Sequence, residues 1–134
     1  MRVLLVDDNP DALLTSSMLF TAEGHIVTMA TNPTEALGHA AATRPEVVVL
    51  DIGMPGMDGF ELARAIRALN HKPRPLIIAV SGYISLDYKK RGIEAGFDFH
   101  YSKTIDPNVI LDTVRQYAGV MAQTRLDHPS GKLH

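Results

Sequence analysis

Short apolar runs rich in β-branched residues alternate with segments of helical periodicity, and this alternation limits the fold more than any other feature of the chain. The expected strands are residues 3–6, 26–30, 47–50, 76–80 and, as a shorter fifth strand, 98–102. Strands separated by helix-length segments are typical of βαβ units, in which a crossover helix joins two parallel strands. The pattern therefore predicts an α/β fold, with a five-stranded parallel sheet covered by helices on both faces.

Capping signals precede the expected helices. Asparagine or aspartate stands directly before proline at Asn9-Pro10, Asn32-Pro33 and Asp106-Pro107, a combination suited to the first turn of a helix. Residues 58–61 form a capping box, and Ser85 is the expected cap of a fourth helix. Behind these caps, apolar residues recur at helical spacing in three stripes: Leu14, Met18 and Ala22; Leu62, Ile66 and Leu69; and Ile110, Leu111, Val114 and Tyr117.

The length of 134 residues suits one domain. Periodicity stops at about Gln123, so we expect residues 1–121 to form the domain and residues 122–134 to form a tail that is disordered, a linker or a remnant of cloning. The chain has no cysteine, which excludes disulfides and Cys-ligated zinc. It has no apolar run of the roughly 20 residues that span a bilayer. A formal net charge of −2 without blocks of like charge argues against nucleic-acid binding by bulk electrostatics, and we expect a cytoplasmic protein.

Polar residues that can carry chemistry fall at the ends of the expected strands. Asp7 and Asp8 follow the first strand, and Asp51 ends the third. Ser81 ends the fourth strand and Lys103 the fifth. Ligands of open α/β sheets bind outside the carboxyl ends of the strands, at the point where the strand order reverses. In the strand order 2-1-3-4-5 of a flavodoxin-like, doubly wound sheet, that point lies between strands one and three, so the three aspartates converge in one crevice.

Three carboxylates a few ångströms apart repel one another unless a cation or protons neutralise them. Oxygen ligands without histidine or cysteine favour a hard ion, namely Mg²⁺, with Mn²⁺ as the alternative. Lys103 and the Ser81 hydroxyl can contact the oxygens of an incoming phosphoryl group, which leaves Asp51 as the nucleophile. Each residue alone has an ordinary structural role as a helix cap, a turn residue or a solvated charge. Their coincidence at successive strand ends favours a phosphoryl site.

Four stretches of the chain together resemble the response-regulator receiver family and cover about residues 1–120 in the family's order. They are Val6-Asp7-Asp8-Asn9, residues 50–59 (Leu-Asp-Ile-Gly-Met-Pro-Gly-Met-Asp-Gly), Val80-Ser81-Gly82-Tyr83, and Lys103. The resemblance implies two-component signal transduction, with a histidine kinase or a histidine phosphotransfer protein as phosphodonor. It also implies a downstream target on the face of the fourth helix, fifth strand and fifth helix, with no direct contact to nucleic acid or membrane. The chain would be a stand-alone receiver or part of a larger regulator or hybrid kinase.

Carried over residue by residue, the resemblance assigns the roles within the site. It implies that the phosphoacceptor is Asp51, that Mg²⁺ is held by Asp8, Asp51 and the Gly53 carbonyl with Asp7 acting nearby, and that the phosphoryl oxygens are bound by Ser81 and Lys103. The chain would then catalyse only its own phosphoryl transfer and dephosphorylation and would not be an enzyme in the usual sense.

Two further roles and one departure follow from the same resemblance. Ser81 and His100 would form the switch, although the family usually has Tyr or Phe in place of His100; histidine there is similar to receivers of hybrid sensor kinases. Gly53 and Tyr83 would tune dephosphorylation by flanking the approach of water. Thr104 follows the lysine where the family usually has a proline joined by a cis peptide, and a cis bond without proline costs about 2.5–4 kcal/mol.

Two other classes of protein use related features. A Mg²⁺-dependent phosphatase of the haloacid-dehalogenase type needs Asp-x-Asp after the first strand, whereas Asp7-Asp8-Asn9 stands there and the best nucleophile follows the third strand. A pseudo-receiver would act only as a scaffold, and the presence of Asp8, Asp51 and Lys103 argues against it. Binding of Mg²⁺ distinguishes a receiver from such a scaffold.

Overall fold

The computed structural model describes residues 1–53, 58–82 and 84–127 and, for residues 125–127, the backbone only. Strands and helices alternate along the chain, as expected. The elements are β1 (Arg2–Val6), α1 (Pro10–Ala22), β2 (Ile26–Ala30), α2 (Pro33–Thr43), β3 (Val47–Asp51), α3 (Gly59–Ala68), β4 (Leu76–Ser81), α4 (Leu86–Ala95), β5 (Phe99–Ser102) and α5 (Pro107–Asp127).

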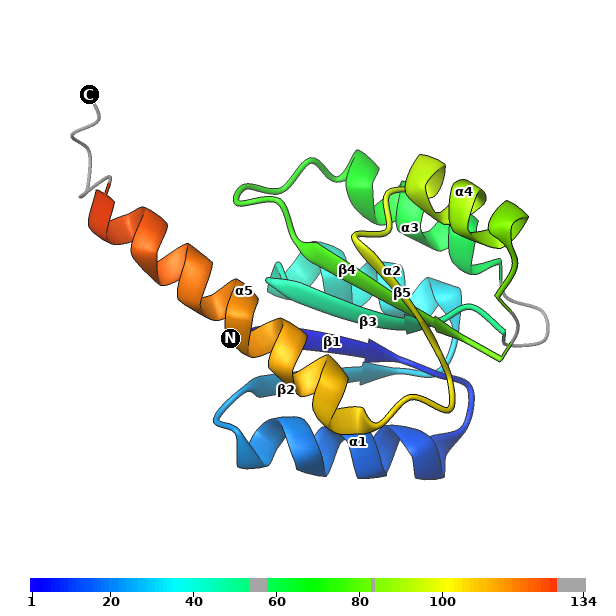
Figure 1. The fold of residues 1–134 in the computed structure, drawn as a ribbon, viewed down its shortest axis with the longest axis horizontal. Coiled ribbons are helices and arrows are strands. Elements are labelled where there is room, and N and C mark those ends of the chain that lie inside the picture. Colours follow the sequence, from blue (N-terminus) through cyan, green and yellow to red (C-terminus); the bar gives the residue numbers. More distant parts are fainter. Residues whose placement is uncertain (54–57, 83, 128–134) are drawn as a thin grey trace.

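The strands form one parallel sheet in the order β2-β1-β3-β4-β5, which confirms the predicted topology. Helices α1 and α5 cover one face of the sheet, and α2, α3 and α4 cover the other (Figure 1). Strands β1 and β3 lie side by side, with Val6 paired to Leu50. The residues that directly follow this pair therefore emerge together at the carboxyl edge of the sheet. Among the described helices, none is both long and apolar enough to cross a membrane.

Each central strand contributes to two cores, because successive side chains of a strand point to opposite faces. In β1, Leu4 and Val6 pack under α2, α3 and α4, whereas Val3 and Leu5 pack under α1 and α5. These four side chains are at most 2% exposed. Burial on both faces explains why the strand has the sequence of a continuous apolar run rather than an alternating one.

The caps and two of the three expected stripes are confirmed. Asn9, Asn32, Asp58 and Ser85 each accept hydrogen bonds from N–H groups in the first turn of a helix. Such bonds satisfy donors that the helix itself leaves free. The stripes of α3 and α5 face the sheet, with buried or partly buried side chains at Leu62, Ile66, Leu69, Ile110, Leu111, Val114 and Tyr117.

Helix α1 buries a different face from the one that its stripe indicated. Leu14 and Met18 are 56% and 64% exposed, and Ala22 is exposed as well. The buried residues are Leu13 and Phe20. Both sets satisfy helical spacing because α1 is apolar on two sides, so periodicity alone could not identify the face that meets the sheet.

Helix α5 is longer than expected. It continues to Asp127, so residues 122–127 are helical where we expected a disordered tail or linker. Residues 120–127 contain neither glycine nor proline, and nothing in the local sequence stops the helix there. The C-terminal half of α5 extends beyond the sheet (Figure 1). The boundary at residue 121 stays a prediction, and residues 128–134 lie outside the described part of the chain.

Candidate functional site

Asp7, Asp8 and Asp51 converge at the carboxyl edge of the sheet, as their positions after β1 and β3 predicted. One carboxylate oxygen from each lies within 4.8 Å of the others. Asp51 is 4% exposed, Asp7 is half-buried and Asp8 is exposed. Among the described residues, no other group of three carboxylates or histidines is spaced this closely. A donor set of oxygen atoms alone fits a hard divalent cation such as Mg²⁺.

The carboxylate of Asp51 is held from two sides. Lys103 Nζ donates a hydrogen bond to Oδ2 over 2.5 Å, and the backbone N–H of Gly53 donates to Oδ1 over 2.8 Å. The Lys103 side chain is 49% exposed, so the ion pair is buried on the Asp51 side and open to water on the other. The sequence suggested the Gly53 carbonyl as a metal ligand but gave no sign of the N–H contact, which depends on the local backbone turn.

Burial and negative charge meet at Asp7. Burial raises the pKa of the Asp7 carboxyl above its ordinary value, and the charges of Asp51 and Asp8 raise it further. The backbone N–H of Asn9, which donates to Asp7 Oδ1 over 3.0 Å, and the charge of Lys103 oppose this rise. The pKa of Lys103 is raised, chiefly by its hydrogen bond to Asp51. The raised pKa of Asp7 reflects burial and repulsion among the three carboxylates, and a bound cation would relieve the repulsion.

A backbone hydrogen bond and a hydroxyl pair arrange the loop that carries Lys103. The Lys103 N–H donates to the Ser81 carbonyl over 2.8 Å, which ties the end of β5 to the end of β4. Thr104 Oγ1 lies 2.9 Å from Ser102 Oγ. The Lys103–Thr104 peptide is trans, since the one cis peptide in the described residues precedes Pro73. Lys103 thus reaches Asp51 without the cis peptide that the family usually has at this point.

Ser81 and His100 are in direct contact. Ser81 is 2% exposed, and its Oγ lies 2.9 Å from His100 Nε2. The His100 ring also meets Phe97 edge-on, with 5.7 Å between the ring centroids. The next residue, Tyr101, packs against the opposite core and pairs its hydroxyl with Thr113 Oγ1, because successive side chains of a strand point to opposite faces. The sequence placed Ser81 and His100 at neighbouring strand ends but could not indicate a bond between them.

Residues 54–57 and Tyr83 lie outside the described part of the chain, so the role expected for Tyr83 stays a prediction. Beyond the first of these gaps, Asp58 Oδ1 accepts hydrogen bonds from the N–H groups of Phe60 and Glu61 and starts α3. Glycine is required at position 59 for a steric reason, because a Cβ there would overlap the side chain of Ile52. The Asp-Gly end of the motif therefore fixes the helix that follows the site.

A cavity of about 190 Å³ opens beside Asp51 and Lys103 and continues between α1 and α5. Its walls are mostly apolar and include Leu13, Leu19, Phe20, Ile110 and Leu111. Sequence patterns could not predict this space, because it depends on how closely two helices distant in sequence approach each other.

Comparison with known proteins places the whole sheet in one family. Residues 3–115 match the family model described as the response regulator receiver domain. Sporulation initiation phosphotransferase F of Bacillus subtilis is 31% identical over 116 residues, which are 87% of this chain and 92% of that protein. The transcriptional regulatory protein PrrA of Mycobacterium leprae is 34% identical over 120 residues; these are 90% of this chain but only 49% of PrrA, so the chain spans about half of that relative.

Solved structures agree with these relatives. A CheY-like response regulator receiver domain protein from Methanospirillum hungatei has a TM-score of 0.83 and 27% identity, with 92% of this chain and 97% of that one covered. The chemotaxis protein CheY4 of Vibrio cholerae has a TM-score of 0.80 and 29% identity, with 86% and 96% covered.

Proposed function

This chain belongs to the response regulator receiver family, and from that membership we propose that it accepts a phosphoryl group on Asp51 with the help of a divalent cation. Its homologues are response regulators and a sporulation phosphotransferase, so its function is phosphoryl acceptance in two-component signalling. The observation that carries the assignment of Asp51 is its position: a nearly buried carboxylate within 4.8 Å of two others and paired to one lysine.

The proposed reaction needs few protein groups. The phosphorus–nitrogen bond of a phosphohistidine donor breaks, and a phosphorus–oxygen bond to Asp51 forms. Lys103 and the Ser81 hydroxyl bind phosphoryl oxygens, which stabilises the charge on the transferring group. The reaction is a change in the protein itself, and receivers act as signalling domains rather than as enzymes on a separate substrate.

The metal proposal rests on the same acid cluster. Asp8 and Asp51 would hold Mg²⁺, or Mn²⁺ in its place, together with the Gly53 carbonyl, and Asp7 would act nearby. The bound ion would neutralise the carboxylates and lower the barrier to an anionic phosphoryl group. The half-exposed Lys103 leaves the site open to the donor on that side.

Receivers interact with histidine kinases or histidine phosphotransfer proteins, and we propose that α1 docks this donor. The helix begins directly after the acid cluster at the same edge of the sheet, and it exposes Leu14 and Met18. A phosphohistidine must reach Asp51 from solvent, so an apolar surface next to the site favours a protein donor over a free small molecule.

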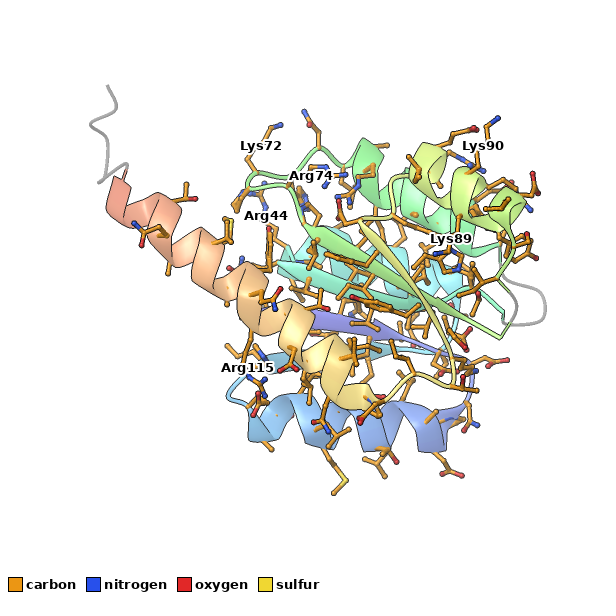
Figure 2. All side chains as sticks on the ribbon, in the orientation of Figure 1. Arg44, Lys72, Arg74, Lys89, Lys90 and Arg115 are labelled. Carbon is orange, nitrogen blue, oxygen red and sulfur yellow. The ribbon has the colours of Figure 1, made fainter. Side chains whose placement is uncertain are left out.

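For the downstream target we propose the face of α4, β5 and α5. Leu86, Ile93 and Phe99 are exposed there by 89%, 75% and 41%. The basic side chains labelled in Figure 2 come from several elements, and the formal net charge of the chain is −2, which supports a protein target over nucleic acid. The cytoplasm stays our prediction for the location, since a chain without cysteine suits a reducing compartment.

One experiment tests the assignment of the phosphoacceptor. Incubation with acetyl phosphate and Mg²⁺ should give one acyl phosphate that is stable in acid and labile in base, and Asp51→Asn should abolish it. Asp11→Asn, a change of an exposed acid in the first turn of α1, is the matched control and should be labelled like the parent. Full labelling of Asp51→Asn would refute the proposal.

A further inference from the structure

The cavity between α1 and α5 reaches the centre of the sheet. Val49 of β3 and Val80 of β4 line its floor, and both are partly exposed although each stands on a strand with neighbours on either side. Protein interiors are packed as densely as organic crystals and contain few spaces larger than a water molecule. The volume of about 190 Å³ is therefore large for this place. It exceeds the roughly 150 Å³ at which an apolar cavity in another protein accommodates benzene.

The two helices complete apolar walls above this floor. Leu13 and Phe20 come from α1, and Ile110 and Leu111 come from α5. Ser16 of α1 adds the one hydroxyl among the described residues that line the cavity. Walls of this kind favour the apolar part of a ligand, because a polar group buried among them would lose its hydrogen bonds to water without replacement.

The charged groups at the mouth of the cavity continue the rows of the floor. Side chains two positions apart on a strand point to the same face of a sheet. On the face that α1 and α5 cover, Leu5 is therefore followed by Asp7, and Val49 is followed by Asp51. Lys103 adds a third charged side chain at the same end. The cavity is thus amphipathic, with an apolar interior and its charged groups at one end.

The mouth favours a cation over an anion. Two carboxylates, Asp7 and Asp51, face one ammonium group, and Lys103 Nζ already lies 2.5 Å from Asp51 Oδ2. Asp7 Oδ1 accepts the N–H of Asn9, and no described residue donates a hydrogen bond to its Oδ2. Asp8 adds negative charge within 4.8 Å. An anion would meet net negative charge here, whereas an ammonium group can donate charge-assisted hydrogen bonds to the carboxylates.

We propose that this cavity binds a small amphipathic amine, with its apolar part between α1 and α5 and its ammonium group on Asp7 and Asp51. The volume limits the apolar part to about one aromatic ring or a short alkyl chain. The ammonium group would compete with Mg²⁺ for the same carboxylates, so the amine would keep the chain from accepting a phosphoryl group. This inhibition rests on the function proposed for Asp51, whereas binding of the amine does not.

Three probes of similar shape test the class of ligand. Phenethylamine, 2-phenylethanol and 3-phenylpropionate carry a cationic, a neutral and an anionic group on one benzene ring. Titration in chelator, followed by two-dimensional NMR of the backbone amides, should show saturable binding of phenethylamine. One charge-assisted hydrogen bond predicts that 2-phenylethanol binds about tenfold more weakly, and 3-phenylpropionate should bind more weakly still. Absence of binding by phenethylamine, or equal or tighter binding of either other probe, would overturn the proposal.

Two adjacent serines of α1 test the place of binding. Ser16 lines the cavity and Ser17 does not, and both are partly exposed. Ser16→Phe should fill the space and abolish binding of phenethylamine, whereas the matched control Ser17→Phe should bind it like the parent. Parent-like affinity of a folded Ser16→Phe would place the amine elsewhere and overturn the proposal.

Asp7→Asn tests the mouth without a change in the apolar walls. It should remove most of the roughly tenfold advantage of phenethylamine over 2-phenylethanol, because one of the two carboxylates is gone. Saturating Mg²⁺ should likewise weaken phenethylamine binding to the parent. An undiminished advantage in Asp7→Asn, or binding that is indifferent to Mg²⁺ in a chain that takes up the metal, would overturn the placement of the ammonium group.

The outcomes separate this proposal from the function proposed for Asp51. Phenethylamine should slow labelling of the parent by phosphoramidate and Mg²⁺, and it should not slow labelling of Ser16→Phe. Unchanged labelling of the parent at saturating amine would refute the inhibition. A parent chain that binds phenethylamine as expected but is never labelled would instead refute the phosphoryl site and leave the amine site standing.

Discussion

Replacement of Asp8 by asparagine tests the metal site without any phosphoryl chemistry. The carboxylates of Asp7, Asp8 and Asp51 lie within 4.8 Å of one another. At that separation two unit charges repel by about 1 kcal/mol in a water-like dielectric and by about 3.5 kcal/mol at an effective dielectric of about 20. Asp8 is exposed and Lys103 opposes the repulsion, so the lower figure applies. In metal-free buffer, Asp8→Asn should therefore raise the free energy of unfolding by about 1 kcal/mol.

With Mg²⁺ the sign reverses, because the same substitution removes a proposed ligand. A ligand present at about 100 times its dissociation constant stabilises the folded state by about 2.7 kcal/mol, and Asp8→Asn should lose most of this gain. Urea unfolding in chelator and in saturating Mg²⁺ measures both effects. Glu94→Gln, a change of an exposed acid on α4, should alter neither. Parent-like stabilisation of Asp8→Asn by Mg²⁺ would refute Asp8 as a ligand, and no gain in chelator would refute the repulsion.

Burial and the nearby Lys89 lower the pKa of His100. Below about pH 6.5 the unfolded state therefore takes up a proton more readily than the folded state, and the free energy of unfolding decreases as the pH is lowered. His100→Phe should flatten this fall in urea midpoints measured from neutral to acid pH; since the pKa of His25 is also lowered, part of the slope should persist, and an unchanged slope would contradict the assignment. Gly53→Asn should shorten the lifetime of the acyl phosphate, measured as loss of label, because the amide can orient a water molecule. A Cβ at this position would lie 3.4 Å from Asp51 Oδ1, so the side chain fits close to the phosphoacceptor. An equal lifetime would exclude control by this position. Met18→Glu should slow transfer from a phosphohistidine protein but not from acetyl phosphate. Val120→Glu, at an apolar position of α5 that is similarly exposed, is the control and should leave both transfer rates unchanged. Equal slowing by Met18→Glu with both donors would place the defect in the phosphoryl site instead.

The sheet order and the acid cluster could be predicted because both depend on positions along the chain. A run such as residues 47–50, apolar at every position, indicates a strand buried on both faces, and Asp51 directly after it must lie at the carboxyl edge. Once β1 and β3 are neighbours, Asp7 and Asp8 meet Asp51 without any knowledge of rotamers. Lys103 contacts Asp51 although the peptide to Thr104 is trans, so the departure at Thr104 did not prevent this contact.

Features that depend on side-chain direction could not be predicted. The bond between Ser81 and His100 joins residues that are not paired in register, since His100 lies beside Ala79 and Ser81 beside Ser102. It requires one particular rotamer of each side chain. The buried face of α1 had the same difficulty, because two apolar stripes had equal periodicity and only the packing against β1 and β2 chose between them.

Asn9 links the metal site to the proposed docking helix. Its backbone N–H donates to Asp7 Oδ1 over 3.0 Å, while its side-chain Oδ1 accepts from the N–H groups of Asp11 and Ala12 and starts α1. A single hydrogen bond therefore connects the carboxylate of Asp7 to the residue that caps the first turn of α1. The exposed side chains of Leu14 and Met18 lie on the same helix, whose direction is set by this cap together with the packing of Leu13 and Phe20 on the sheet. An apolar face exposed on a helix is unfavourable for a protein alone in water, and it is better tolerated where a partner covers it during transfer. Asn9 joins that face to the carboxylates that the partner must reach, so we expect docking on α1 and metal occupancy at Asp7 and Asp8 to influence each other.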